Sequence, residues 1–358
     1  MKTLSNSQGN HIRWINCGKF CAIIAVLVDH TNGILYTNQN IAIWSYFSVS
    51  LFILLSGITT WFSYEKKNGN FFVGKRVLKI FTPYILAVFI YQLCHFHYFD
   101  FDTYISYLIS FNISGPFYFI SLFLQLILVS PILYIMLKKT TLNELHKCIF
   151  QDSLVLLLII LVSYFTTNYT NIRNIYGGGG RLLGGTYLIL YYLGMLFAKH
   201  YSFFKKCNLL LSSTAFAALY LVWFFFECTN RFSLDKKFPF GTGFNPPSIT
   251  SMTMAIIVMG LIFSTISFLE IRIRGSLGKR IIDIMDFIGK NTLYIFLYHR
   301  LFLDYLLLPY FSITIKWIKI AVYFGVMIFG PISISMCLNF IKLYLMGMPS
   351  NSSVSVRS

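Results

Sequence analysis

Long apolar runs separated by short polar segments form the main pattern of this chain. A helix needs about 20 apolar residues to cross a bilayer. Ten runs approach that length, and we expect membrane spans near residues 14–36, 41–63, 80–98, 116–137, 150–167, 183–199, 207–226, 248–269, 287–308 and 317–341. No other segment is long enough for a second domain. The pattern therefore predicts an all-α, polytopic integral membrane domain over 13–345, with roughly ten transmembrane helices. We expect a cytoplasmic tail over 1–12 and a disordered cytoplasmic tail over the polar residues 346–358.

Composition and charge agree with a membrane protein. The chain is 56% hydrophobic and 11% charged, whereas a soluble domain has about 25% charged residues. In a soluble protein the net charge of +17 would suggest nucleic acid. Here the cations lie in short segments between apolar runs, so we expect no nucleic-acid partner. With the N-terminus in the cytoplasm, 20 of the 29 Lys and Arg residues fall in cytoplasmic segments and 7 in external ones. The positive-inside rule then predicts a multi-pass cell-membrane protein with both termini in the cytoplasm.

The first span carries ionisable residues within the stretch KFCAIIAVLVDH, which runs from Lys19 to His30. Eleven residues at about 100° each make roughly three turns, so both side chains lie on one helix face, about 16 Å apart. If the hydrocarbon begins near Phe20, His30 lies near the bilayer centre. The spacing predicts a cation that binds an anionic ligand and an imidazole that performs proton chemistry deeper in the membrane. Asp29 lies about 100° around the helix from His30 and is poorly placed to orient it.

A structural reading of the same two residues stays open. Lys19 would then reach toward lipid headgroups, and His30 would make a hydrogen bond inside the helical bundle.

Five cations lie in the loop EKKNGNFFVGKRVLKIFTP between the second and third spans. Topology or anionic lipid would account for their sign. Arg76 and Lys79 are three residues apart, so on a helix they share a face. Such a pair suits a phosphate-rich ligand, because Arg supplies a planar fork and Lys a point charge. We expect Lys75 to contribute to the same ligand.

Three further groups carry weaker patterns. The segment 176–185, YGGGGRLLGG, lacks the Lys-Ser/Thr ending of a phosphate loop, and we expect an external turn. The segment 95–102, HFHYFDFD, offers possible metal ligands, but we favour an interfacial turn. No metal site is expected from the seven cysteines, which form no CxxC pair. In the ninth span Arg300 and Asp304 are four residues apart and could form an ion pair beside His299.

The segment INCGKFCAIIAVLVDH resembles the opening of the acyltransferase family 3 membrane proteins. That opening reads I-D-x-x-[RK], then ten residues, then His, and Ile15, Lys19 and His30 fall on it. Asn16 stands where Asp is usual. Lys19 stands where Arg is commoner, which keeps the charge but loses the bidentate fork. Other resemblances follow in order along residues 13–340: LFILLSG (51–57), Arg76-Val-Leu-Lys79 with Pro83, GPFYFISLFLQLILVSPIL (115–133) and IGKNTLYIFLYH (288–299).

The resemblance implies an O-acyltransferase that moves an acetyl group from cytoplasmic acetyl-CoA to a hydroxyl of a cell-surface or precursor glycan. His30 is then the catalytic residue, as a general base or as a transient acyl carrier. The residues expected to bind acetyl-CoA are Lys19, Lys75, Arg76 and Lys79. His299, which falls on the late motif, and Asp29 are expected to contact the substrate, with His299 lining the same cavity as His30.

A multi-span transporter or glycan-lipid flippase is the alternative. It would also account for ten spans with intramembrane charges. However, the two halves of the chain show no matched pair of spans interrupted by Gly or Pro, which many transporters use. The charged features instead converge on the first span and the neighbouring cytoplasmic loop.

Overall fold

The computed structural model describes residues 13–139, 145–170, 181–229, 247–272, 275–311 and 313–345. Helices make up nearly all of this part of the chain, and it contains no strand, so the all-α prediction is confirmed. The chain divides into two compact units, Met1–Lys290 and Asn291–Ser358, and each is described separately. The predicted tails and most of the glycine run lie outside the described residues.

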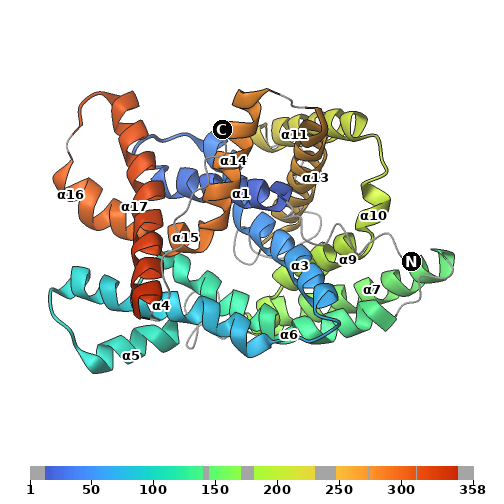
Figure 1. Cartoon of the computed structure of the whole chain (residues 1–358), viewed down its shortest axis with the longest axis horizontal. Helices are drawn as coiled ribbons and strands as arrows, with labels where there is room; N and C mark the ends of the chain where they lie inside the picture. The colour runs from blue at the N-terminus through green and yellow to red at the C-terminus, as the bar shows by residue number, and fades with distance from the viewer. Residues whose placement is uncertain are drawn as a thin grey trace. The chain divides into compact units, whose positions relative to one another are not determined.

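The helices follow one another with short connections (Figure 1). The first unit contains α1 (Arg13–Thr31), α2 (Gln39–Ser45), α3 (Ser48–Lys66), α4 (Val73–Phe96), α5 (Phe101–Ser110), η1 (Gly115–Phe117), α6 (Tyr118–Lys139), α7 (Leu145–Tyr169), η2 (Leu182–Gly184), α9 (Tyr187–Lys199), α10 (Tyr201–Phe204), α11 (Leu209–Cys228), α13 (Ile249–Arg272) and α14 (Ser276–Lys290). The second contains α15 (Thr292–Phe302), the π-helix η3 (Leu303–Leu307), α16 (Leu308–Tyr310) and α17 (Lys316–Leu345).

Seven helices among the described residues are long and apolar enough to cross a membrane. They contain the residues of α3, α4, α6, α7, α11, α13 and α17, with α2 continuous with α3. Helix α9 is apolar but has 13 residues. Helix α1, which carries Arg13, Lys19 and Asp29, is not among the seven, and neither is α15. A membrane protein is therefore supported, while the count of ten spans stays a prediction.

Helices α3 and α9 pack closely at the centre of the first unit because glycines face each other's backbone. A Cβ atom on Gly57 of α3 would overlap the carbonyl oxygen of Tyr191 in α9. A Cβ atom on Gly194 of α9 would overlap the carbonyl oxygen of Leu54 in α3. Small residues let membrane helices approach at this distance. The glycine of LFILLSG is therefore a packing residue.

Helix α1 is enclosed by other helices of the first unit. It packs against α3, α13 and α14, and Trp14, Ile23 and Leu27 are almost fully buried. A helix surrounded by protein does not need an entirely apolar surface. This position explains why α1 carries charged residues that a lipid-facing helix would exclude.

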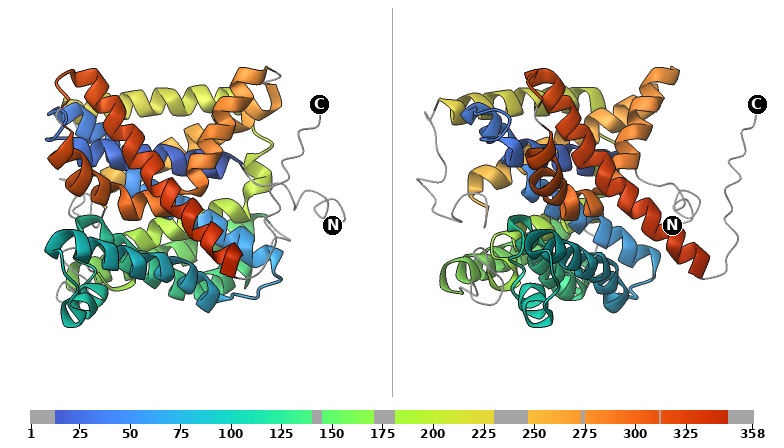
Figure 2. Two further views of the ribbon diagram at one scale, coloured as in Figure 1. Left: turned by 60° about the vertical axis from the view of Figure 1, so that its left-hand side comes forward. Right: turned by 90° about the vertical axis from the view of Figure 1, so that its left-hand side faces the viewer.

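The chain between α4 and α6 contains the turn predicted from the sequence and also a helix, α5, that the sequence pattern did not predict. Helix α4 ends at Phe96, and the next residue, His97, has a left-handed φ of 61°. Asp100 caps α5 by accepting a hydrogen bond from the backbone N–H of Thr103 at 2.8 Å. Hydrogen bonds from Thr103 hold the pKa of the exposed Asp100 carboxyl below its usual range. The predicted turn in HFHYFDFD is thus confirmed, and it turns the chain so that α5 packs back against α4 (Figure 2).

The second unit is built on the contact between α15 and α17. Arg300 Nε lies 3.0 Å from Asp304 Oδ2, so the predicted ion pair is confirmed. The backbone widens into the π-helix at Leu303–Leu307, and the Tyr323 hydroxyl of α17 donates to the Leu307 carbonyl oxygen at 3.0 Å. The predicted ninth span, 287–308, is not one helix: α14 ends at Lys290 and α15 begins at Thr292.

Candidate functional site

Helix α1 runs without a break from Arg13 to Thr31, so Lys19 and His30 lie on one helix, as predicted. Both side chains are half-buried. The helix ends five residues before the predicted end at 36, which places His30 in its last turn rather than in its interior. The early end has a physical cause. The Tyr36 hydroxyl donates to the Val28 carbonyl oxygen at 2.7 Å, while Gly33, with φ of 85°, turns the chain back.

Polar side chains gather around Asp29, next to His30. The Ser45 hydroxyl of α2 interacts favourably with the Asp29 carboxylate, although in the structure its proton is donated to the Ala42 carbonyl oxygen at 2.7 Å. Its charge also acts on the hydroxyl groups of Tyr36, Tyr46 and Tyr118. Asp29 is half-buried, so its interactions are only partly screened by solvent. The structure therefore places Asp29 in a group of hydroxyls at the end of α1.

Arg76 is the loop cation that the structure directs into the protein. Its Nη2 atom donates to the Thr60 hydroxyl of α3 at 2.5 Å. The guanidinium carbon lies 5.2 Å from the centre of the Tyr64 ring, at a distance suited to a cation–π interaction. Thr60 in turn lies 2.6 Å from the Tyr191 hydroxyl of α9. Arg76 is thus positioned by α3, and through Thr60 it is linked to α9.

One side of the Arg76 guanidinium has no partner within the protein. The Nη1 atom is buried and makes no hydrogen bond, although five N–H donors of Arg normally find acceptors. Arg76 also lies in the first turn of α4, whose N-terminus has no side-chain cap. Helix N-termini carry unsatisfied N–H groups and a partial positive charge that favour anions. An anionic oxygen at this position would satisfy both features.

The other predicted cations separate into two groups. The ammonium groups of Lys19 in α1 and Lys79 in α4 are close enough for their charges to repel each other. Lys75 lies 5.3 Å from the centre of the Phe72 ring, which Lys67 also approaches at 4.5 Å. The structure therefore brings Lys19 together with Lys79, whereas Lys75 packs on an exposed aromatic ring. Binding of a donor by these residues stays a prediction.

Asn16, the departure from the family opening, has a partner in α14. Its Nδ2 atom donates to Asp286 Oδ1 at 2.8 Å, and this contact is buried. Asp286 Oδ2 lies 2.5 Å from Lys290 Nζ. A Cβ atom on Gly289 would overlap the backbone carbonyl oxygen of Asn16. The amide of Asn16 therefore donates to the Asp286 carboxylate of another helix. An Asp at position 16 would place two carboxylates at this distance, and their negative charges would repel each other.

His299 is fully buried in α15. Its Nδ1 atom lies 3.0 Å from the Ile295 carbonyl oxygen and 2.9 Å from that of Phe296. Because a carbonyl oxygen only accepts, Nδ1 carries the proton and donates to its own helix. This leaves Nε2 as the nitrogen for any other interaction. The role of His299 beside His30 stays a prediction.

Sequence reasoning missed a buried polar cluster that joins α7 to α9. Lys199 Nζ lies 2.7 Å from Asp152 Oδ1, and His200 Nε2 lies 2.9 Å from Asp152 Oδ2. A signal for it existed, because Asp152 is the only charged residue of the apolar segment Ile149–Tyr169. Ionisable residues in such segments are usually paired or functional. The partners of Arg76, by contrast, are common Thr and Tyr residues without any such signal.

Among the residues that the structure describes, no group of three or more His, Cys, Asp or Glu side chains could hold a metal ion. The donor set of the candidate site is cationic and hydroxylic, which suits anions. Acyl transfer from a thioester needs a base and a site for the donor, and α1 and α4 offer residues of both kinds.

Comparison with known proteins agrees with this chemistry. The model of acyltransferase family 3, described as an acyltransferase domain, matches residues 12–336 of the 358-residue chain. No curated protein and no solved structure matches the chain. The family match covers both units and every motif quoted above. The chain therefore belongs to acyltransferase family 3, a family of membrane acyltransferases.

Proposed function

We propose that this membrane acyltransferase moves an acetyl group from acetyl-CoA to a hydroxyl group of a cell-surface or precursor glycan. The protein lies in the cell membrane with both termini in the cytoplasm, as the distribution of Lys and Arg favours. Acetyl-CoA then reaches Arg76 and Lys79 from the cytoplasm.

The unpartnered Nη1 atom of Arg76 is the observation that carries the donor proposal. A buried guanidinium nitrogen without an acceptor is unfavourable, and a phosphate oxygen of coenzyme A would supply one. Thr60 holds Nη2, so the orientation of the fork is set before the ligand arrives. Lys19 and Lys79, whose charges repel each other, would both be stabilised by the same polyanion.

His30 supplies the proton chemistry of the proposal. The hydroxyl oxygen of the acceptor attacks the thioester carbonyl carbon while the His30 imidazole removes the hydroxyl proton. The C–S bond then breaks, and the coenzyme A thiolate leaves and takes up a proton. In the second form, an imidazole nitrogen of His30 attacks the thioester and takes the acetyl group, the C–S bond breaks, and coenzyme A leaves as the thiol after taking up the imidazole proton. The acceptor hydroxyl oxygen then attacks the acyl-imidazole, the C–N bond breaks, and the hydroxyl proton passes to the released imidazole. Both forms need His30 as the reacting residue.

The hydroxyl groups around Asp29 suit a sugar acceptor. Ser45, Tyr36 and Tyr46 offer hydrogen-bond donors and acceptors within the field of the Asp29 carboxylate. Tyrosine rings also present an apolar face together with a polar tip. Asp29 would accept a hydrogen bond from an acceptor hydroxyl next to the His30 imidazole.

The test is complementation of a host from which the gene has been deleted. Wild type, His30→Ala and His95→Ala are expressed to equal levels in the membrane, and ester-linked acetate is measured on purified surface glycans. His95, an exposed histidine at the end of α4, is the matched control. Wild type and His95→Ala are expected to restore the acetate, and His30→Ala to leave it absent. Full restoration by His30→Ala refutes the catalytic assignment, and unchanged acetate after deletion refutes the glycan acceptor.

A further inference from the structure

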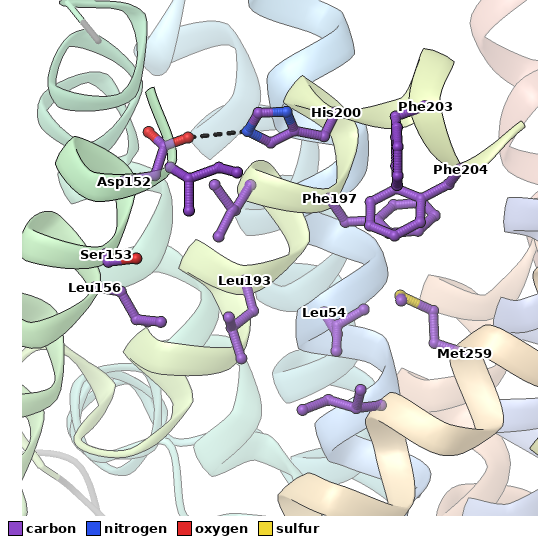
Figure 3. A pocket seen from close by; sticks show the side chains of 13 residues that line it. Leu54, Asp152, Ser153, Leu156, Leu193, Phe197, His200, Phe203, Phe204 and Met259 are labelled. Atoms are coloured by element: carbon purple, nitrogen blue, oxygen red, sulfur yellow. Dashed lines mark hydrogen bonds and ion pairs between the residues drawn. The ribbon is translucent and has the colours of Figure 1, made fainter. Parts of the chain in front are cut away.

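A cavity of about 460 Å³ lies among α3, α7, α9, α10 and α13, away from the residues assigned to the transferase (Figure 3). Its volume is within the roughly 300–1,000 Å³ typical of ligand pockets. Apolar side chains form most of the wall, among them Leu54, Leu156, Leu193, Phe197 and Met259. The apolar wall suits a hydrocarbon ligand, because water would find few hydrogen-bond partners along it.

The polar lining residues are Asp152, Ser153 and His200, and the two ionisable ones lie together at one end of the cavity. Asp152 and His200 lie at that end in Figure 3, where the dashed line marks their contact of 2.9 Å. Lys199 completes the cluster, with Nζ at 2.7 and 2.9 Å from the two Asp152 oxygens. The side chains of Lys199 and Asp152 are only 3% and 6% exposed. The charges compensate each other, so the polar end presents a closed hydrogen-bonded cluster to the apolar space.

The polar end coincides with helix ends and the apolar end with helix interiors. His200 follows the last residue of α9 and Asp152 lies within two turns of the start of α7. Leu54 and Met259 lie in the interiors of α3 and α13. In a membrane protein, helix ends lie near the headgroups and helix interiors lie in the hydrocarbon. The polar end of the cavity therefore lies where a lipid headgroup lies, and its apolar end extends in the direction of a lipid acyl chain.

Several of the apolar residues that line the cavity are also exposed on the surface of the first unit. Ile149, Phe203 and Ile256 line it and are 51%, 64% and 37% exposed. A route bordered by such side chains admits a hydrocarbon chain from the bilayer, whereas a soluble polar ligand would have to cross an apolar rim.

Two exposed lysines come directly after the lining residues Phe203 and Phe204 in the sequence. Lys205 and Lys206 lie at the same helix end as the polar cluster. The Glu270 carboxylate acts on Lys205 and offsets part of its charge, which leaves Lys206 as the stronger attraction. Basic residues at headgroup level attract anionic phospholipids. A zwitterionic headgroup would gain much less from them.

We propose that this cavity binds one acyl chain of an anionic phospholipid, whose headgroup lies at Lys205 and Lys206. The bound lipid fills the apolar space between α7, α9 and α13. This site is separate from donor binding by Arg76 and from acetyl transfer at His30.

The test uses the full chain in phosphatidylcholine discs that contain phosphatidylglycerol with a photoreactive group on one acyl chain. After irradiation, labelled peptides are identified by mass spectrometry. Label is expected on α7, α9 and α13 at the cavity wall. Leu156→Trp fills the cavity and should abolish this label, whereas Leu157→Trp, one residue away on the exposed side of α7, should keep it.

The charge contribution is tested with a second matched pair of variants. Lys205→Gln/Lys206→Gln is expected to reduce cavity labelling about fivefold through Lys206, and by less through Lys205, whose charge Glu270 partly offsets. Lys279→Gln/Arg280→Gln, an exposed cationic pair on α14, should leave the labelling unchanged. Equal labelling by a phosphatidylcholine probe refutes the anionic preference. Equal label in Leu156→Trp and Leu157→Trp, or cross-links between two copies in place of lipid label, refutes the acyl-chain site.

Discussion

Replacing Arg76 by Lys separates the charge of this residue from its planar fork. The lysine keeps the positive charge and can still approach the Tyr64 ring. It loses the hydrogen bond that Nη2 donates to Thr60. It also loses the Nη1 donor, which is buried and has no acceptor within the protein. The binding free energy of coenzyme A should therefore become less favourable by the contribution of one hydrogen bond to a charged group, about 1.5–3 kcal/mol. This corresponds to a roughly 10- to 150-fold rise in Kd.

Isothermal titration of coenzyme A into the purified full chain measures this change. Lys66→Gln is the control, because it removes a charge from the same loop without touching the Arg76 contacts. A surface charge contributes at most about 1 kcal/mol, so Lys66→Gln should raise Kd by about fivefold or less. If general attraction between the loop and a polyanion were responsible, Lys66→Gln would weaken binding more than Arg76→Lys. That order, or an unchanged Kd for Arg76→Lys, refutes phosphate binding by Arg76.

Two further predictions concern the helix contacts that hold the site. Gly57→Ala should destabilise the α3–α9 contact by about 1–3 kcal/mol, measured by unfolding in mixed micelles. Gly74→Ala is the control and should not destabilise the protein, because its Cβ atom meets open space. Equal effects of the two variants would contradict close packing at Gly57. Asp152→Asn should cost about 3–5 kcal/mol because it leaves Lys199 buried without its anion. Asp152→Asn/Lys199→Met should recover much of that loss, and a double variant as unstable as the single would contradict pairing.

Local patterns account for the parts of the fold that were predicted correctly. Apolar runs of span length mark helices because the backbone must satisfy its own hydrogen bonds in lipid. The face shared by Lys19 and His30 and the pairing of Arg300 with Asp304 follow from the helical period. These relations involve residues within three turns of one helix.

The predictions failed where the chain left the pattern of membrane spans. Helices α5 and α14 were not expected, because each is amphipathic and lies in a segment read as a loop. Helix α1 ends early because the chain turns back at Gly33, where φ is 85°, and the Tyr36 hydroxyl then donates to the Val28 carbonyl oxygen. Hydropathy detects spans that lipid surrounds, and it is less sensitive to helices that pack along the surface of a bundle.

The amino-acid sequence was sufficient to identify a helical membrane acyltransferase, since helical period and motif spacing are local properties, and it predicts His30 and Arg76 as site residues. It did not show that Arg76 meets Thr60 of α3, that Asn16 meets Asp286 of α14, or that Asp152 meets Lys199 across 47 residues of chain. Those contacts depend on how each helix is rotated and how closely it approaches its neighbours. Both are set by the interlocking of side chains from two helices at once, as at Gly57 and Gly194.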